Sequence, residues 1–163
     1  PVAHNEVPPV PKKGAGIVPV LLVGCALLMG GVVVVGILAA IAIPNFVEQQ
    51  YRAKRAEVPS NVKGIKTAQI AYDAAFDTYI EVSSYKPSSS VGEAQRSWVS
   101  GTDFDTLGWM PDGKVRGAYK VTSSSSTDFR VTGICDVDGD GIRASFTATK
   151  SINTVMVTGA TTY

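Results

Sequence analysis

The chain has 163 residues, a formal net charge of +1, two cysteines and one histidine. A net charge this small provides no strong field for nucleic acid or an acidic substrate. The histidine, His4, lies in a proline-rich segment, which leaves little scope for histidine-based catalysis or metal binding, and Cys25 and Cys135 imply no disulfide framework.

Residues 1–16 form a proline-rich N-terminal tail without periodicity. Proline favours an extended polyproline conformation over a helix. Two interpretations remain open, a disordered lead-in and a tail that docks on a partner.

Residues 17–43 are predicted to form a transmembrane helix. The segment has no charged residue and reads IVPVLLVGCALLMGGVVVVGILAAIAI. At about 1.5 Å per residue it is long enough to cross a hydrocarbon layer of roughly 30 Å. Lys12 and Lys13 resemble the start of a secretory signal, and Leu22 to Cys25 match a lipoprotein cleavage box. Because the apolar run is longer than that of a signal peptide, we expect a retained anchor in membrane lipid.

Small residues recur four apart within this span, at Ala26 and Gly30 and again at Gly36 and Ala40. This spacing lets a neighbouring helix approach closely in lipid, although glycine and alanine are common in spans generally. We therefore predict a helix-packing surface here.

Residues 44–80 are predicted to continue the span as an amphipathic helix. Apolar residues recur every third or fourth position, as at Val58, Val62 and Ile65, with Gln69 in one slot. Pro44 and Pro59 are expected to bend the helix, whose total length should be about 60 residues.

Residues 81–163 are predicted to form a head with an antiparallel sheet. A polar loop should cover 81–113 and include a short helix over 93–99. Phe104, Leu107, Trp109 and Met110 are expected to pack under the head. Strands are expected at 114–122, 129–135, 142–149 and 154–159, which gives an α+β fold with one sheet face on the amphipathic helix.

The most specific local motif is an acidic turn with carboxylates at Asp136, Asp138 and Asp140. Alternating carboxylates followed by glycine copy the first half of a calcium loop. In a calcium loop of the helix-loop-helix type the twelfth position is a glutamate that binds the ion with both oxygens, and here that position is Thr147. An acidic hairpin turn is the simpler interpretation, in which Arg130 and Arg143 neutralise the charge.

No motif in the sequence indicates catalysis. Cys135 has no histidine partner in the head, and the sequence has neither a phosphate-binding glycine loop nor a paired-histidine metal motif. Basic residues are scattered, which gives nucleic-acid binding little support. We expect no enzyme activity and no small-molecule substrate.

The run from Gly36 to Phe46, GILAAIAIPNF, resembles the N-terminal helix of bacterial type IV pilins and type II secretion pseudopilins. The resemblance covers roughly residues 31–80 and implies a long bent helix packed on an antiparallel sheet. It also implies subunits that leave the inner membrane and stack their helices in a filament. Pro44 and Phe46 therefore join the predicted helix-packing residues.

The sequence departs from the family at the processing site. The family has a cleavage glycine, an aromatic first residue and a glutamate, and the matching positions here are Leu22, Val23 and Leu27. Lys12, Lys13 and Gly14 resemble the basic leader but lie eight residues too early.

Three functions remain open on this sequence. The favoured one is a single-pass pilin-like structural subunit of the bacterial inner membrane that assembles with other copies of itself, with its head in the periplasm or on an extracellular filament. The others are a pilin-derived subunit embedded in another membrane complex and a calcium-dependent binding head on an anchor.

Overall fold

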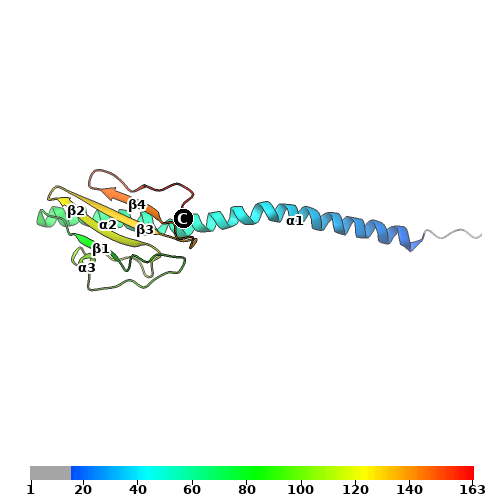
Figure 1. Ribbon diagram of the computed structural model, residues 1–163, viewed down its shortest axis with the longest axis horizontal. Coiled ribbons are helices and arrows are strands. Elements are labelled where there is room, and N and C mark those ends of the chain that lie inside the picture. The colour runs from blue at the N-terminus through cyan, green and yellow to red at the C-terminus, as the bar shows by residue number, and fades with distance from the viewer. Residues whose placement is uncertain (1–15) are drawn as a thin grey trace, which may run out of the picture. The chain divides into compact units, whose positions relative to one another are not determined.

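The computed structural model of the chain describes residues 16–163 (Figure 1). The proline-rich tail thus lies, apart from Gly16, outside the described residues. The chain divides into two compact units, which end and begin at Asn45 and Phe46. The first contains only helix in its described part, and the second is the folded head together with the helix segment that belongs to it.

The predicted long bent helix is confirmed. Helix α1 runs from Ile17–Arg55 and α2 from Glu57–Phe76, with an interruption at Ala56. The interruption lies three residues before Pro59, whose missing N–H leaves the carbonyl of Arg55 without its usual helical partner. Pro59 itself stands in the first turn of α2, where proline is tolerated, and Pro44 lies inside α1.

The head contains a five-stranded antiparallel sheet in the order β1-β2-β3-β4-β5. Its strands are β1 (Val82–Lys86), β2 (Ala118–Ser125), β3 (Asp128–Cys135), β4 (Ala144–Thr149) and β5 (Val155–Met156). The α+β class is therefore confirmed. The prediction that residues 81–113 lack a strand was wrong, because β1 pairs with β2 at the edge of the sheet through an irregular register.

Strand β2 begins later than predicted because the backbone N–H groups just before it donate to the carboxylate of Glu57 instead of to a neighbouring strand. Glu57 accepts hydrogen bonds from the N–H of Arg116 at 2.9 Å and of Gly117 at 3.4 Å. It also accepts one from the Tyr119 hydroxyl at 3.2 Å. This acidic group in the first turn of α2 thus fixes where the sheet starts against the helix.

Helix α2 lies against β3 and β4 and supplies one side of the core. Val58, Val62 and Ile65 are fully buried and follow the predicted helical spacing. Gln69 is also fully buried, and its amide closes two hydrogen bonds with the backbone of Ile80, at 2.6 and 3.1 Å. The polar residue in the apolar stripe therefore fastens the segment that follows the helix.

The segment between β1 and β2 packs on the core with little regular structure. The helix predicted over 93–99 is absent there, because Arg96 instead forms a β-bridge with Val115. A short helix, α3 (Asp103–Thr106), follows, capped by the Thr102 side chain. Phe104 is fully buried, but the prediction for Met110 was wrong, since its side chain is 67% exposed.

Arg96 holds this segment through backbone oxygens. Its guanidinium donates to the carbonyls of Ser88, Ser90, Arg116 and Gly117, at 2.5 to 3.1 Å. Partial burial lowers its pKa, as expected for a cation moved out of water. The Arg96 side chain therefore satisfies four backbone carbonyls in a segment that has little regular hydrogen bonding of its own.

The last residues of the chain form a clasp on α1, defined here as the contacts of residues 160–163 with Glu48, Arg52 and Arg55. The Tyr163 hydroxyl donates to Glu48 at 2.7 Å and accepts from Arg52 at 3.4 Å. Arg55 lies 4.9 Å from the Tyr163 ring centroid and donates to the carbonyls of Ala160 and Thr162. The hydrogen bond from Tyr163 is the largest cause of the lowered pKa of Glu48.

We predict that Gly133→Ala destabilises the head by about 2–3 kcal/mol. A Cβ at Gly133 would lie 2.6 Å from a methyl of Val62 and 2.8 Å from one of Val58, so β3 and α2 would have to separate. Unfolding of the full chain in detergent, followed by tryptophan fluorescence, measures the change. Gly92→Ala is the matched control, because a Cβ there meets no atom within 4 Å. Equal stability of the two variants would contradict the close approach.

Candidate functional site

The described part of the first unit is a bare apolar helix. The large apolar side chains from Val20 to Ile43 are 56 to 74% exposed, and the most apolar 18-residue window has a mean hydropathy of 2.8. The helix is long and apolar enough to cross a membrane. A surface of this kind requires a cover of lipid or of other helices, since large apolar surfaces are unstable in water.

The predicted helix-packing residues all lie along α1. Ala26, Gly30, Gly36 and Ala40 fall within about 120° of one another around the helix axis, given 100° per residue. A Cβ atom added at Gly30 or Gly36 would meet nothing within 4 Å among the described residues. Pro44 ends this stretch, and Phe46 is 64% exposed on the helix segment of the head. Whether these residues contact another helix stays a prediction.

Sequence reasoning missed a second feature of this helix, a shallow groove at Gly31. The groove has a volume of about 350 Å³ and is lined by Leu27, Leu28, Gly31, Val32 and Val35. It lies on a different side of the helix from Gly36. Gly31, which has no side chain among larger apolar neighbours, was the signal that could have located it.

The acidic turn joins β3 to β4 and brings the three predicted carboxylates together. One oxygen from each of Asp136, Asp138 and Asp140 lies within 4.8 Å of the others. Asp136 is buried and accepts from the N–H of Gly139 at 2.7 Å and of Gly141 at 3.1 Å. Both glycines have positive φ, +75° and +83°, which the predicted turn requires.

Asp138 is the unusual member of the turn. Its Oδ1 is buried and has no hydrogen-bond partner among the described residues. Burial raises the pKa of Asp138, and the neighbouring carboxylates of Asp140 and Asp136 add to the rise. The turn therefore has one oxygen that a cation would satisfy.

The predicted neutralisation by arginine is not observed among the described residues. Neither Arg130 nor Arg143 lies within ion-pair distance of these carboxylates, and the ion pairs in residues 16–163 are Arg52–Glu48 and Lys150–Asp73. A fourth acid, Glu93, was missed. Its Oε1 lies 2.8 Å from the position that a Cβ of Gly139 would occupy, so it packs directly on the turn.

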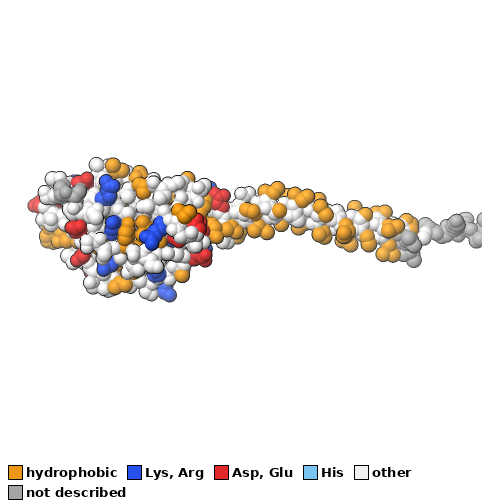
Figure 2. Space-filling view, viewed as in Figure 1, with side chains coloured by type: hydrophobic (Ala, Val, Ile, Leu, Met, Phe, Trp, Pro, Cys, Tyr) orange, Lys and Arg blue, Asp and Glu red, His pale blue; other side chains and the backbone are white. Residues whose placement is uncertain are grey.

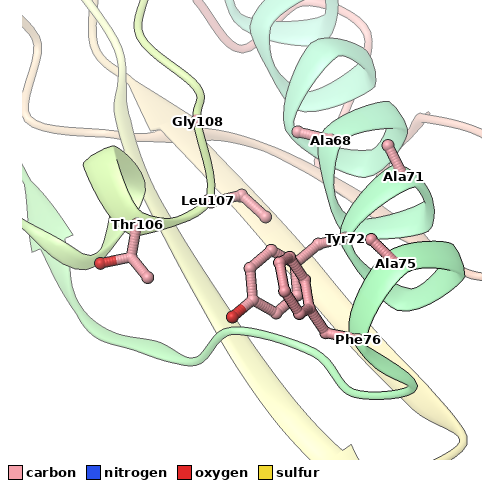
Figure 3. A pocket seen from close by; sticks show the side chains of 8 residues that line it. All are labelled: Ala68, Ala71, Tyr72, Ala75, Phe76, Thr106, Leu107 and Gly108. Atoms are coloured by element: carbon pink, nitrogen blue, oxygen red, sulfur yellow. The ribbon is translucent and has the colours of Figure 1, made fainter.

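A groove of about 510 Å³ on the head lies between α2 and the end of α3. Figure 3 shows Tyr72 and Phe76 projecting from α2 toward Leu107, with three alanines along the helix. The two rings are 4.5 Å apart. None of the lining side chains is charged: Ala68, Ala71, Tyr72, Ala75, Phe76, Thr106, Leu107 and Gly108.

The two tryptophans and Cys135 are part of the packed head. Trp98 and Trp109 are partly buried against the core in an edge-on contact of 5.5 Å. Gly64 makes room for Trp109, whose Nε1 lies 2.9 Å from the position of a Cβ there. Cys135 is fully buried, and burial raises the pKa of its thiol to about 12, which removes it as a nucleophile.

Comparison with known proteins gives one informative result. The type IV major pilin protein PilA of Myxococcus xanthus (strain DK1622) is 48% identical over 52 residues, which is 32% of this chain. The match covers 24% of that protein, so this chain spans about a quarter of its relative's length. No family model matches the chain, and no solved structure matches it. The identity to this pilin and the long apolar N-terminal helix together support a type IV pilin-like family for the chain.

Proposed function

We propose that this protein is a non-enzymatic, pilin-like structural subunit with a single membrane span, which assembles by helix packing. Its partners are membrane lipid and other copies of itself. The proposal places the span in the bacterial inner membrane and the head in the periplasm or on an extracellular filament of the pilus or pseudopilus type.

The observation that carries this proposal is the exposed apolar surface of α1. From Pro19 to Asn45 the described helix has no acidic, basic or histidine side chain that could serve proton or ion transfer, and its small residues favour close helix packing. In lipid, association of such helices depends on close contact at glycine and alanine. A structural role in an assembly of helices fits this chemistry and the relative's printed description.

The alternative is a pilin-derived subunit that stays embedded in another membrane complex. It is favoured by Leu22, Val23 and Leu27, which stand where the family has its cleavage glycine, aromatic first residue and glutamate. Without an acid in the apolar helix, a subunit cannot form an ion pair with the terminal amine of its neighbour. Assembly would then depend only on the packing of apolar helices.

The native N-terminus distinguishes these two proposals. For a processed subunit, mass spectrometry of the protein purified from its own cells should find a new methylated N-terminus near Val23. Retention of the residues that precede the span would instead support the embedded subunit.

We predict that Gly36→Leu reduces the assembled fraction about tenfold, because the leucine side chain would hold neighbouring helices apart. Sedimentation of assemblies released from cells measures this fraction. The control is Ile37→Leu, which keeps a large apolar side chain at the adjacent position. If both variants assemble like the unaltered protein, Gly36 has no role in packing.

We propose calcium binding at the acidic turn as a second function. It is favoured by the three carboxylates within 4.8 Å and by the unpartnered buried Oδ1 of Asp138. Ca²⁺ takes six to eight oxygen ligands, so backbone carbonyls and water would complete the set.

Asp138→Asn tests the calcium proposal in two arms. Because the pKa of Asp138 is raised, the folded chain holds this proton more tightly than the unfolded chain. The resulting stabilisation is present below the usual pKa of aspartate and is lost as pH rises through the raised pKa. Without calcium at neutral pH, the variant should therefore melt a degree or two higher than the unaltered protein.

With millimolar calcium the order should reverse, because only the unaltered protein gains stability from the bound ion. Asp112→Asn is the control, an exposed acid outside the turn. No calcium-dependent shift and no heat in isothermal titration of the full chain in detergent would rule out the site.

A further inference from the structure

The sheet has an outer face, turned away from α2, that carries cations and hydroxyl groups. Side chains alternate along a strand, so the neighbours of the buried Tyr119, Val121, Phe129 and Val131 point outward. Three cross-strand rows result from the observed register: Ala118–Ile134–Ser145, Lys120–Thr132–Thr147 and Thr122–Arg130–Thr149. Ala118 and Ile134 are buried, so the open part of the face consists of the other two rows, whose six positions hold no carboxylate. By the same alternation Asp128, at the start of β3, borders these rows next to Arg130.

The cations of this outer face form no ion pair with another residue that the structure describes. Lys120 Nζ lies 4.9 Å from the ring centroid of Tyr85. Burial raises the pKa of Tyr85, and the charge of Arg143, the residue before β4, opposes this rise. Arg130 is exposed. Lys120, Arg130 and Arg143 take no part in the ion pairs found in the described residues.

The head carries the complementary charge at the acidic turn. Asp136, Asp138 and Asp140 together with Glu93 place four carboxylates around one hairpin, and these also lack ion pairs within residues 16–163. Figure 2 shows Lys and Arg side chains spread over the visible face of the head and a group of acidic side chains beside them. Arg143 follows Asp140 by three residues, so the acidic turn and the cations of the outer face adjoin one another along the chain.

We propose that the outer face of the sheet in one copy binds the acidic turn of a second copy. Like charges that repel within each region are then paired between subunits, and the hydroxyl groups of the sheet supply donors to the carboxylates. The contact joins two different surfaces, so each copy keeps one of each free and the arrangement extends into an open helical array. This inference rests on the proposed structural function and names the surfaces through which the heads meet.

Zero-length cross-linking with a carbodiimide tests the contact in the full chain. Assemblies are formed from an equal mixture of ¹⁴N- and ¹⁵N-labelled protein, and cross-linked peptides are identified by mass spectrometry. Bonds between Lys120 of one label and an aspartate of the acidic turn of the other label are expected. Their absence from sedimented assemblies overturns the inference.

Charge reversal gives an independent readout. Arg130→Glu alone and Asp140→Lys alone should each reduce the sedimented fraction about tenfold at low salt, and the double variant should recover most of it. Lys63→Glu and Asp112→Lys are the controls, since both change exposed charges outside the two regions. A loss in the controls equal to that in the variants, or no recovery in the double variant, contradicts the contact.

The two proposals fail in different ways. If the unaltered protein sediments as an assembly but gives no mixed-label cross-link, the head contact is wrong and the structural function stands. If the unaltered protein does not assemble from native membranes, the structural function is wrong, and the head contact that depends on it is wrong as well.

Discussion

The head depends on the close packing of α2 against the glycine of strand β3. Val58 and Val62 are fully buried and come so near Gly133 that no Cβ fits between helix and sheet. This approach brings Glu57 within reach of the backbone ahead of β2, and it brings Gln69 to Ile80 at the other end of the helix. Apolar burial supplies the driving force, while the two polar contacts fix the register in which it occurs.

Much of this architecture could be predicted from the sequence. The apolar run before Pro44, the stripe of Val58, Val62 and Ile65, and the strand-forming residues near the end of the chain each follow a simple period. The acidic turn was also located correctly, because aspartate and glycine favour tight turns through local hydrogen bonds. These features depend on residues that are close in sequence.

What could not be predicted depends on contacts across the chain. Strand β1 contains two serines and lies at the sheet edge, so no alternation marks it. The segment around Arg96 is held by a guanidinium that reaches four carbonyls, a pattern without any local signal. At the candidate sites, Gly31 and Glu93 were missed for the same reason, since their roles appear only when neighbours are placed around them.

The clasp of residues 160–163 on Glu48, Arg52 and Arg55 has a mechanical consequence. It ties the end of the chain to the helix segment that enters the head, ahead of the turn at Ala56. Moving this helix segment away from the sheet would therefore require breaking the contacts of residues 160–163 as well as the packing of α2 on β3 and β4. The sheet is thus attached to the helix at two places, through the core side chains of α2 and through the residues that follow β5.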